Sequence, residues 1–230
     1  LVRSTLPLTL AVSLFAALST AHAADAMGGM KEMKAMESRT FKIHVENVST
    51  TATLKLSNGS TAPAPTSPVF WTVFTGSCPL FTTGQADKGW GLEALAEDGN
   101  PTALVTKFTG MADHAAAGAV AVPNGDTQAG PLLPGKSFDL TVTAAPGQRL
   151  MLAMMFGQSN DLFYAPEAAG IALFDRKGAP LSGDITKQLL LWDAGTEVNQ
   201  EPGLGADQGP RQKGPNTGAD EQGVVRLVKD

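Results

Sequence analysis

Short apolar segments separated by Gly and Pro run from Thr40 to the end of the chain, and they constrain the fold most. Phe41, Ile43 and Val45 alternate with polar residues in the first segment, as is typical of a half-buried strand. Further strands are expected at 54–56, 69–74, 137–143, 149–156, 171–174, 187–192 and 224–228. About eight short strands without alternating helices favour an antiparallel sandwich or barrel.

One short helix is expected within 89–98, because Leu92, Leu95 and Ala96 recur at helical spacing and Gly99 follows where a helix end accepts a left-handed residue. Residues 110–135 are rich in Ala, Gly and Pro and predict a long loop with at most one weak strand. The Pro-Gly turn at 144–147 is suited to a hairpin between its flanking strands. The tail 195–223 predicts an ordered loop lying across the domain, and long loops of this kind are often functional.

The N-terminus has the pattern of a secretory signal peptide spanning residues 1–23. Arg3 precedes an apolar run of 13 residues, Leu6 to Leu18, which ends near Ala21-His22-Ala23, a site that signal peptidase would cut after Ala23. The run is shorter than the ~20 residues that a membrane-spanning helix needs. We therefore expect a periplasmic or secreted protein with no membrane span after signal removal.

Residues 24–39 form a flexible, Met-rich segment ahead of a single domain at 40–230. Its methionines recur at a spacing of three, at Met27, Met30, Met33 and Met36. Thioether clusters bind soft ions such as Cu(I), so a periplasmic copper-handling protein is one alternative function. A processed N-terminal tail without a metal role is the other reading of the same segment.

Charge and cysteine content exclude several classes of function. The formal net charge is −5 and the basic residues are scattered, which argues against a nucleic-acid partner. The single cysteine, Cys78, cannot form an internal disulfide and is expected to be a small buried side chain.

Catalytic patterns are missing from the sequence. The mature chain has two histidines, His44 on the polar face of a strand and His114 in an Ala-rich loop, and no nucleophile elbow, H-E-x-x-H or phosphate-binding loop. Glu97 and Asp98 are adjacent, so their side chains point apart, and Glu97 is expected to bond loop backbone. We expect a protein that is not an enzyme, with a hydrolase as the weakest reading.

Two aspartates follow strongly apolar strands. Asp161 comes after the strand at 150–156, and Asp193 directly after the strand at 189–192. Loops held by rigid strands are where calcium sites are built, since Ca²⁺ takes six to eight oxygen ligands in flexible geometry. The alternative is that each aspartate only shapes a turn. Glu197 either joins such a site or is solvated.

Several blocks of the sequence resemble a spondin domain over about residues 41–228. The resemblance is carried by Ser67-Pro68 ahead of a strand, Gly91 to Gly99, Ser159-Asn160-Asp161 and the Trp-Asp-Ala-Gly-Thr block at 192–196. It implies a β-sandwich related to C2 domains, of the kind found in extracellular matrix and adhesion proteins, with calcium at one edge. It carries Asp161 and Asp193 over as calcium ligands, with Asp139 as a weaker third ligand.

The combined expectation is an exported, non-enzymatic binding or adhesion module of the spondin type, stabilised by Ca²⁺ at one edge of the sandwich. Its partner would be an extracellular or envelope protein or a glycan.

Overall fold

The computed structural model describes residues 10–17, 37–78 and 80–229, which form two antiparallel sheets packed face to face, with two helices. The first sheet has the strand order β11-β1-β2-β7. Its strands are β11 (Gly183–Asp184), β1 (Leu10–Ala17), β2 (Arg39–Asn47) and β7 (Ser137–Ala144).

The second sheet has the order β13-β12-β9-β8-β5-β6, and a further short strand, β10, pairs with β8. Its strands are β13 (Arg226–Leu227), β12 (Leu190–Asp193), β9 (Leu162–Ala165), β8 (Arg149–Met155), β5 (Val69–Phe74), β6 (His114–Val120) and β10 (Ile171–Ala172). The remaining elements are the hairpin β3 (Leu54–Lys55) and β4 (Thr61–Ala62), the helices α1 (Leu92–Asp98) and α2 (Thr102–Thr109), and a 3₁₀ turn at Thr186–Gln188. Among the described residues, eight strands have four or more residues, so the predicted sandwich of about eight strands is confirmed.

The main core lies between the two sheets. In β2 and β7 buried residues alternate with more exposed ones. Phe41, Ile43 and Val45 of β2 therefore lie beside Phe138 and Leu140 of β7 on the core side of the first sheet. Each such side chain contributes roughly 1.5–3 kcal/mol through burial. The opposite, polar face of these two strands meets water, as their period of two predicts.

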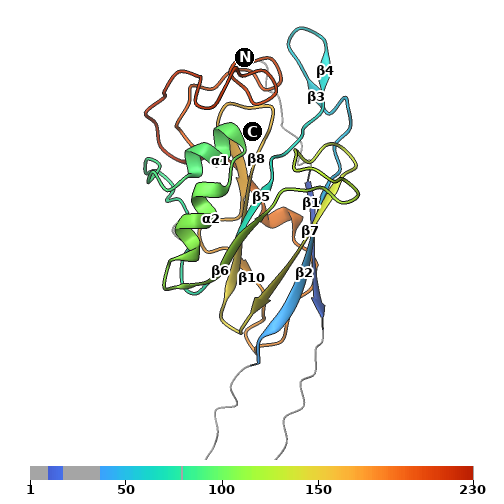
Figure 1. Ribbon diagram of the computed structural model, residues 1–230, viewed down its shortest axis with the longest axis vertical. Coiled ribbons are helices and arrows are strands. Elements are labelled where there is room, and N and C mark those ends of the chain that lie inside the picture. The colour runs from blue at the N-terminus through green and yellow to red at the C-terminus, as the bar shows by residue number, and fades with distance from the viewer. Residues whose placement is uncertain (1–9, 18–36, 79, 230) are drawn as a thin grey trace, which may run out of the picture.

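A second core lies on the outer face of the second sheet, beneath the helices. Figure 1 shows α1 and α2 on the side of that sheet that faces away from β2 and β7. Phe70 and Phe74 of β5 are buried here against Leu92 and Phe108, whereas Val69 and Val73 of the same strand lie in the main core. This explains why β5 is apolar on both faces.

Two helices replace the single one that the sequence predicts. Helix α1 ends as expected, with Gly99 at φ 66°, but α2 begins only a few residues later. Half of the residues in α2 are β-branched, so its intrinsic helix propensity is weak. Burial of Leu104 and Phe108, four residues apart on one face, stabilises the helix nevertheless. The expected loop at 110–135 likewise contains a full strand, β6.

The predicted hairpin across residues 144–147 is wrong. Strand β7 pairs with β2 in one sheet, and β8 pairs with β5, β9 and β10 in the other, so the turn crosses between sheets. The burial patterns give the physical reason. Strand β7 is buried on one face only, while β8 is buried on both and must therefore lie centrally in the covered sheet.

The predicted signal peptide, residues 1–23, overlaps β1. Residues Leu10 to Ala17 pair along β2, with Leu10 opposite Asn47, and Leu10, Val12 and Leu14 are buried in the main core. A segment cannot be both removed by signal peptidase and retained as a core strand of the same mature molecule. The cleavage therefore stays a prediction. The Met-rich residues Met27 to Met36 lie outside the described residues.

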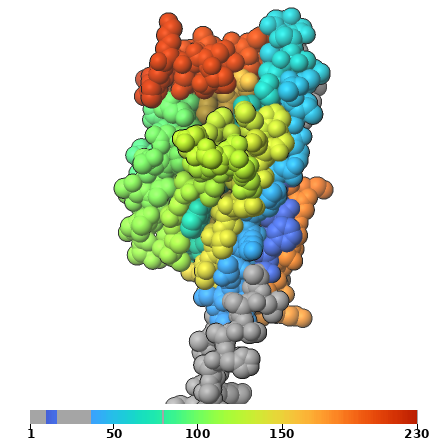
Figure 2. Space-filling model, turned by 45° about the vertical axis from the view of Figure 1, so that its right-hand side comes forward, coloured from blue at the N-terminus to red at the C-terminus, as the bar shows by residue number. Residues whose placement is uncertain are grey.

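The tail 195–223 is an ordered loop, as predicted. It crosses one end of the sandwich and returns, with one isolated bridge between Glu197 and Asp220. Figure 2 shows it gathered at that end beside the β3–β4 hairpin. We call this part of the molecule the loop end. In the described part of the chain, no helix has the length and apolar character needed to cross a membrane.

Candidate metal centre at the loop end

Asp161 and Asp193 meet because of the register between β9 and β12. These strands are antiparallel neighbours, and Asp193, the last residue of β12, lies opposite Leu162, the first residue of β9. Asp161 immediately precedes Leu162, so both carboxylates reach the same edge of the sheet. The predicted convergence of these two distant residues is what the structure shows.

Glu221 completes a group of three acidic side chains. Each of the three offers a carboxylate oxygen, and these oxygens lie within 4.8 Å of one another. Glu221 lies where the loop returns to the sheet, ahead of β13, and its backbone N–H donates to the Thr196 carbonyl. Sequence reasoning missed Glu221, since its only local signal is an acidic residue a short distance before the last strand.

Asp139 lies elsewhere, in β7 of the first sheet. Its carboxylate bonds the His44 ring nitrogen Nδ1 at 2.7 Å and accepts from the Asn124 amide at 2.8 Å. It is not part of the group formed by Asp161, Asp193 and Glu221. The structure therefore does not bring this weaker predicted ligand to the other two.

Asp161 is fully buried, and only one of its oxygens has a partner. Oδ2 accepts the backbone N–H groups of Thr196 at 2.8 Å and Glu197 at 3.1 Å, whereas Oδ1 is buried without a hydrogen-bond partner. Burial raises the pKa of Asp161 to about 6, and the nearby Asp193 carboxylate adds to that rise. A buried carboxylate oxygen without a partner is costly, and a bound cation would compensate it.

Asp193 connects the site to both ends of the loop. Its Oδ1 accepts the Gly195 N–H at 2.8 Å, and its Oδ2 accepts the Asn199 amide and the Arg226 guanidinium, each at 2.7 Å. Arg226 also pairs with Glu221 at 2.8 Å. The guanidinium thus neutralises two of the three carboxylates, and a cation bound here would compete with it.

The three carboxylates suit a hard divalent cation. Carboxylate oxygens from loops, completed by backbone carbonyls and water, are the usual ligands of Ca²⁺. The unpartnered Asp161 Oδ1 offers one ligand directly, while Asp193 and Glu221 would be released by a movement of Arg226, whose side chain is 44% exposed. Asp161, Asp193 and Glu221 are therefore the residues that could hold a metal ion here.

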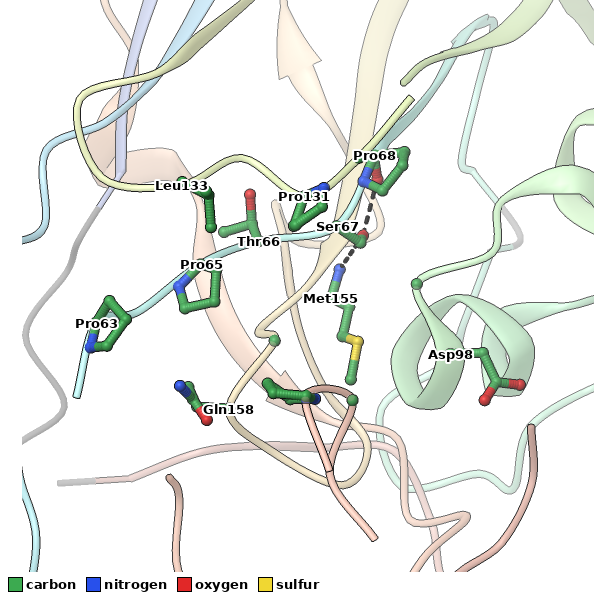
Figure 3. A pocket seen from close by; sticks show the side chains of 15 residues that line it. Pro63, Pro65, Thr66, Ser67, Pro68, Asp98, Pro131, Leu133, Met155 and Gln158 are labelled. Atoms are coloured by element: carbon green, nitrogen blue, oxygen red, sulfur yellow. Dashed lines mark hydrogen bonds between the residues drawn. The ribbon is translucent and has the colours of Figure 1, made fainter. Parts of the chain in front are cut away.

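Three hollows lie around this centre, and the loop 195–223 contributes residues to each. The first, about 490 Å³, is lined by five prolines and four glycines together with Leu133, Met155 and four polar residues (Figure 3). Ser67 organises its floor, accepting the Met155 N–H and donating to the Pro68 carbonyl, both at 2.8 Å. The second, about 370 Å³, is acidic, and the third, about 670 Å³, includes Asp193 in its wall.

The histidines and the cysteine have structural surroundings. His114 is buried against the rings of Phe74 and Phe108 and lies 2.8 Å from the Thr72 hydroxyl, which itself donates to the Ala116 carbonyl. Burial lowers the pKa of His114. Cys78 is buried as predicted, and burial raises its pKa to about 12, so the thiol stays protonated.

No protein-family model matches the chain, and no curated protein matches it either.

Proposed function

We propose that this chain is an exported, non-enzymatic binding or adhesion module of the spondin type, in which Ca²⁺ at Asp161, Asp193 and Glu221 fixes the loop that contacts the partner. Two lines of reasoning support the proposal. The spondin-like motifs at 159–161 and 192–196 contribute both aspartates. The sandwich has the layered antiparallel form that such a module needs.

The observation that carries the proposal is the position of the acidic group at the base of the loop. Asp161 bonds the start of the loop at Thr196 and Glu197, Asp193 bonds Gly195 and Asn199, and Glu221 lies at the loop's return. One cation bound to all three would tie the two ends of the loop together. The loop's residues line all three hollows, so its order would control their shape.

The partner class follows from export and from the character of these hollows. The hollows at the loop end combine prolines and apolar side chains in the first with carboxylates in the second, so they offer both apolar and polar contacts to a partner. We propose an extracellular or envelope protein or glycan as the partner and a periplasmic or secreted location. Binding of the purified protein to envelope fractions, with Ca²⁺ and with a chelator, tests the dependence on the metal.

Thermal unfolding during a Ca²⁺ titration tests the metal site. A ligand at ten times its dissociation constant stabilises the folded form by about 1.4 kcal/mol, which for a chain of this size raises the midpoint by roughly 3–5 °C. Asp161→Asn and Asp193→Asn should abolish that rise. Asp139→Asn, an equally conservative change in the other sheet, is the matched control and should keep it. An unchanged midpoint in the wild type, or equal responses in all three variants, would remove calcium from the proposal.

Copper handling by Met27 to Met36 is the second candidate, favoured by the regular spacing of the four methionines. It predicts Cu(I) binding that is lost when all four are changed to Leu, while the Ca²⁺ response stays. Cu(I) binding that survives this change would rule the segment out as the ligand.

A further inference from the structure

The acidic hollow at the loop end adjoins the metal centre, but none of the three carboxylates of that centre lines it. It lies between α1 and the loop 195–223, and five carboxylates line it: Asp87, Glu93, Glu97, Glu197 and Asp220. Glu93 and Glu97 stand four residues apart on α1 and therefore share one face of the helix. Among the described residues that line the hollow, none is Lys, Arg or His. We call it the acidic pocket.

Glu97 is the residue that points to a ligand. Its side chain is 3% exposed, and its Oε2 is buried without a hydrogen-bond partner, although the carboxylate also bonds Thr196. Burial raises the pKa of Glu97 to about 7 despite that bond, and the charges of Glu197 and Glu93 add to the rise. A buried carboxylate left in this state is destabilising unless a positive charge compensates it.

The neighbouring carboxylates accept hydrogen bonds from neutral groups. Glu93 accepts the Asn216 amide at 3.2 Å, Glu197 accepts the Asn160 amide at 2.9 Å, and Asp220 accepts the Gln222 N–H at 2.8 Å. These donors are neutral amides, so the negative charges remain. Burial raises the pKa of Glu93, and the charges of Asp87 and Asp220 add to that rise.

We propose that the acidic pocket receives a basic side chain, the ammonium or guanidinium group of a Lys or Arg in a protein partner. This inference rests on the proposed binding function and specifies its partner chemistry. The volume favours a side chain over a bare ion. About 370 Å³ lies in the range of organic ligand sites, whereas a cation coordinated at 2.3–2.6 Å would leave most of this space empty.

Charge-assisted hydrogen bonds would provide both affinity and specificity. A guanidinium can fork onto Glu97 and one further carboxylate, and its aliphatic stem can lie along the glycine backbone at Gly195 and Gly218 in the pocket wall. A partner segment with one exposed Arg or Lys would thus insert at the loop end while the metal centre holds the loop in place.

Fluorescence anisotropy with a labelled tetra-arginine peptide tests the inference, using the whole protein with saturating Ca²⁺. A tetra-citrulline peptide, neutral and nearly isosteric, is the ligand control. We expect binding of the arginine peptide only, weakened about tenfold by Glu97→Gln. Glu46→Gln, which removes a half-exposed carboxylate from β2 and gives the same net charge, should change the affinity less than twofold.

Folding is followed in parallel, since Glu97 is buried. Glu97→Gln removes an uncompensated buried charge, so its unfolding midpoint should equal or exceed that of the wild type. Equal binding of both peptides, or equal loss in Glu46→Gln, would reduce the effect to non-specific attraction and overturn the proposal. A second titration starts from the metal-free protein with the peptide bound. One-for-one displacement of the peptide as Ca²⁺ is added would make the pocket a metal site and also overturn the proposal.

The two proposals fail separately. A Ca²⁺ response without peptide binding would reject the basic partner and leave the calcium-stabilised module intact. Peptide binding without a Ca²⁺ response would reject the metal centre and leave the acidic pocket.

Discussion

Aspartates meet opposite environments in the sandwich body and at the loop end. In the body, Asp139 lies on the outer face of β7, where its side chain is 64% exposed and both oxygens have partners, His44 and Asn124. At the loop end, Asp161 is fully buried and one of its oxygens has none. Solvent screens the first charge, whereas burial makes the second costly.

The sandwich body and the loop end are stabilised by different interactions. The body is stabilised by apolar packing between sheets, including Phe41 and Phe138, each fully buried. The loop end has no strand or helix in residues 198–219 of the described chain and depends on side-chain bonds to Asp161, Asp193 and Asn160. The body would therefore fold without a ligand, while the loop end is where a cation or partner would have the greatest effect.

The largest effect is expected in the body, from loss of β1. Leu10, Val12 and Leu14 are buried, and their removal costs roughly 4–9 kcal/mol as an upper bound from three aliphatic side chains. We expect a chain that begins at Ala24 to be less stable by several kcal/mol in urea unfolding. Equal stability would show that β2 does not need this neighbour.

Mass spectrometry of the protein isolated from the cells that make it, and from their medium, decides the fate of these residues. An N-terminus at Ala24 would establish cleavage and give the body a first sheet without β1. An N-terminus before Leu10 would establish β1 as a structural strand and show that the signal-peptide prediction is wrong.

The next largest effect on stability is expected from substituting two glycines, one in each region. Gly195 at the loop end has φ 70°, and a Cβ there would lie 2.5 Å from the backbone nitrogen of Val224. Gly147, in the turn after β7, has φ 92° with nothing within 4 Å of a Cβ. Gly147→Ala should cost about 1–2 kcal/mol through backbone strain alone.

Gly195→Ala should lower the free energy of unfolding further, by about 2–4 kcal/mol, because the backbone of Val224 must also move to make room for the Cβ. It should weaken Ca²⁺ binding as well, since Gly195 bonds Asp193. Urea unfolding and calcium titration of both variants measure this. Equal costs and an unchanged calcium response would mean that the loop end adapts freely.

Local patterns in the sequence predicted the body well and the loop end in part. The alternation of Phe41, Ile43 and Val45 predicts a half-buried strand because burial on one face follows directly from a period of two. Asp161 and Asp193 could be predicted to lie near each other because each follows an apolar strand, and these two strands, β8 and β12, flank β9 on either side.

The errors concern contacts that depend on partners far along the chain. The turn at 144–147 has suitable hairpin residues, but strand pairing is decided by which faces must be buried, and β8 needs both covered. Glu221 joins the site only because β13 pairs with β12, a register that no local pattern specifies. Helix α2 forms because Leu104 and Phe108 fill the space over β5.

A smaller effect is expected from pH, and the two carboxylates that dominate it lie at the loop end. In the body, burial lowers the pKa of His114, which acts in the opposite direction and destabilises the folded form as pH falls. The folded-state pKa values of Asp161, about 6, and Glu97, about 7, are raised above the ordinary values of 3.8 and 4.5. The folded form therefore binds protons more tightly than the unfolded form, so stability falls as pH rises from about 4 to 7. The expected loss is on the order of 1–3 kcal/mol without Ca²⁺.

Urea unfolding in a chelator across this pH range measures the slope. Asp161→Asn should reduce the slope and leave the part that Glu97 contributes, whereas Asp139→Asn should leave the slope unchanged. Saturating Ca²⁺ should also reduce it, because the metal favours the ionised carboxylates. A slope that is the same in both variants would assign the pH dependence to other groups.

The smallest effects on stability are expected from breaking two ion pairs, one in each region. Arg226 bonds Asp193 at 2.7 Å at the loop end, and Lys136 bonds Asp126 at 2.6 Å beside β7. The side chains of Lys136 and Asp126 are both 39% exposed, and exposed pairs contribute about 0.2–1 kcal/mol, so Lys136→Gln should hardly change the unfolding midpoint. Arg226→Gln should lower it more, because Asp193 is buried and loses its positively charged partner. Their calcium affinities should differ, because Arg226 occupies carboxylates that the metal would use. Calorimetric titration should show about two- to fivefold tighter Ca²⁺ binding in Arg226→Gln and no change in Lys136→Gln. Weaker binding in Arg226→Gln would instead mean that the guanidinium positions Asp193 and Glu221 for the metal.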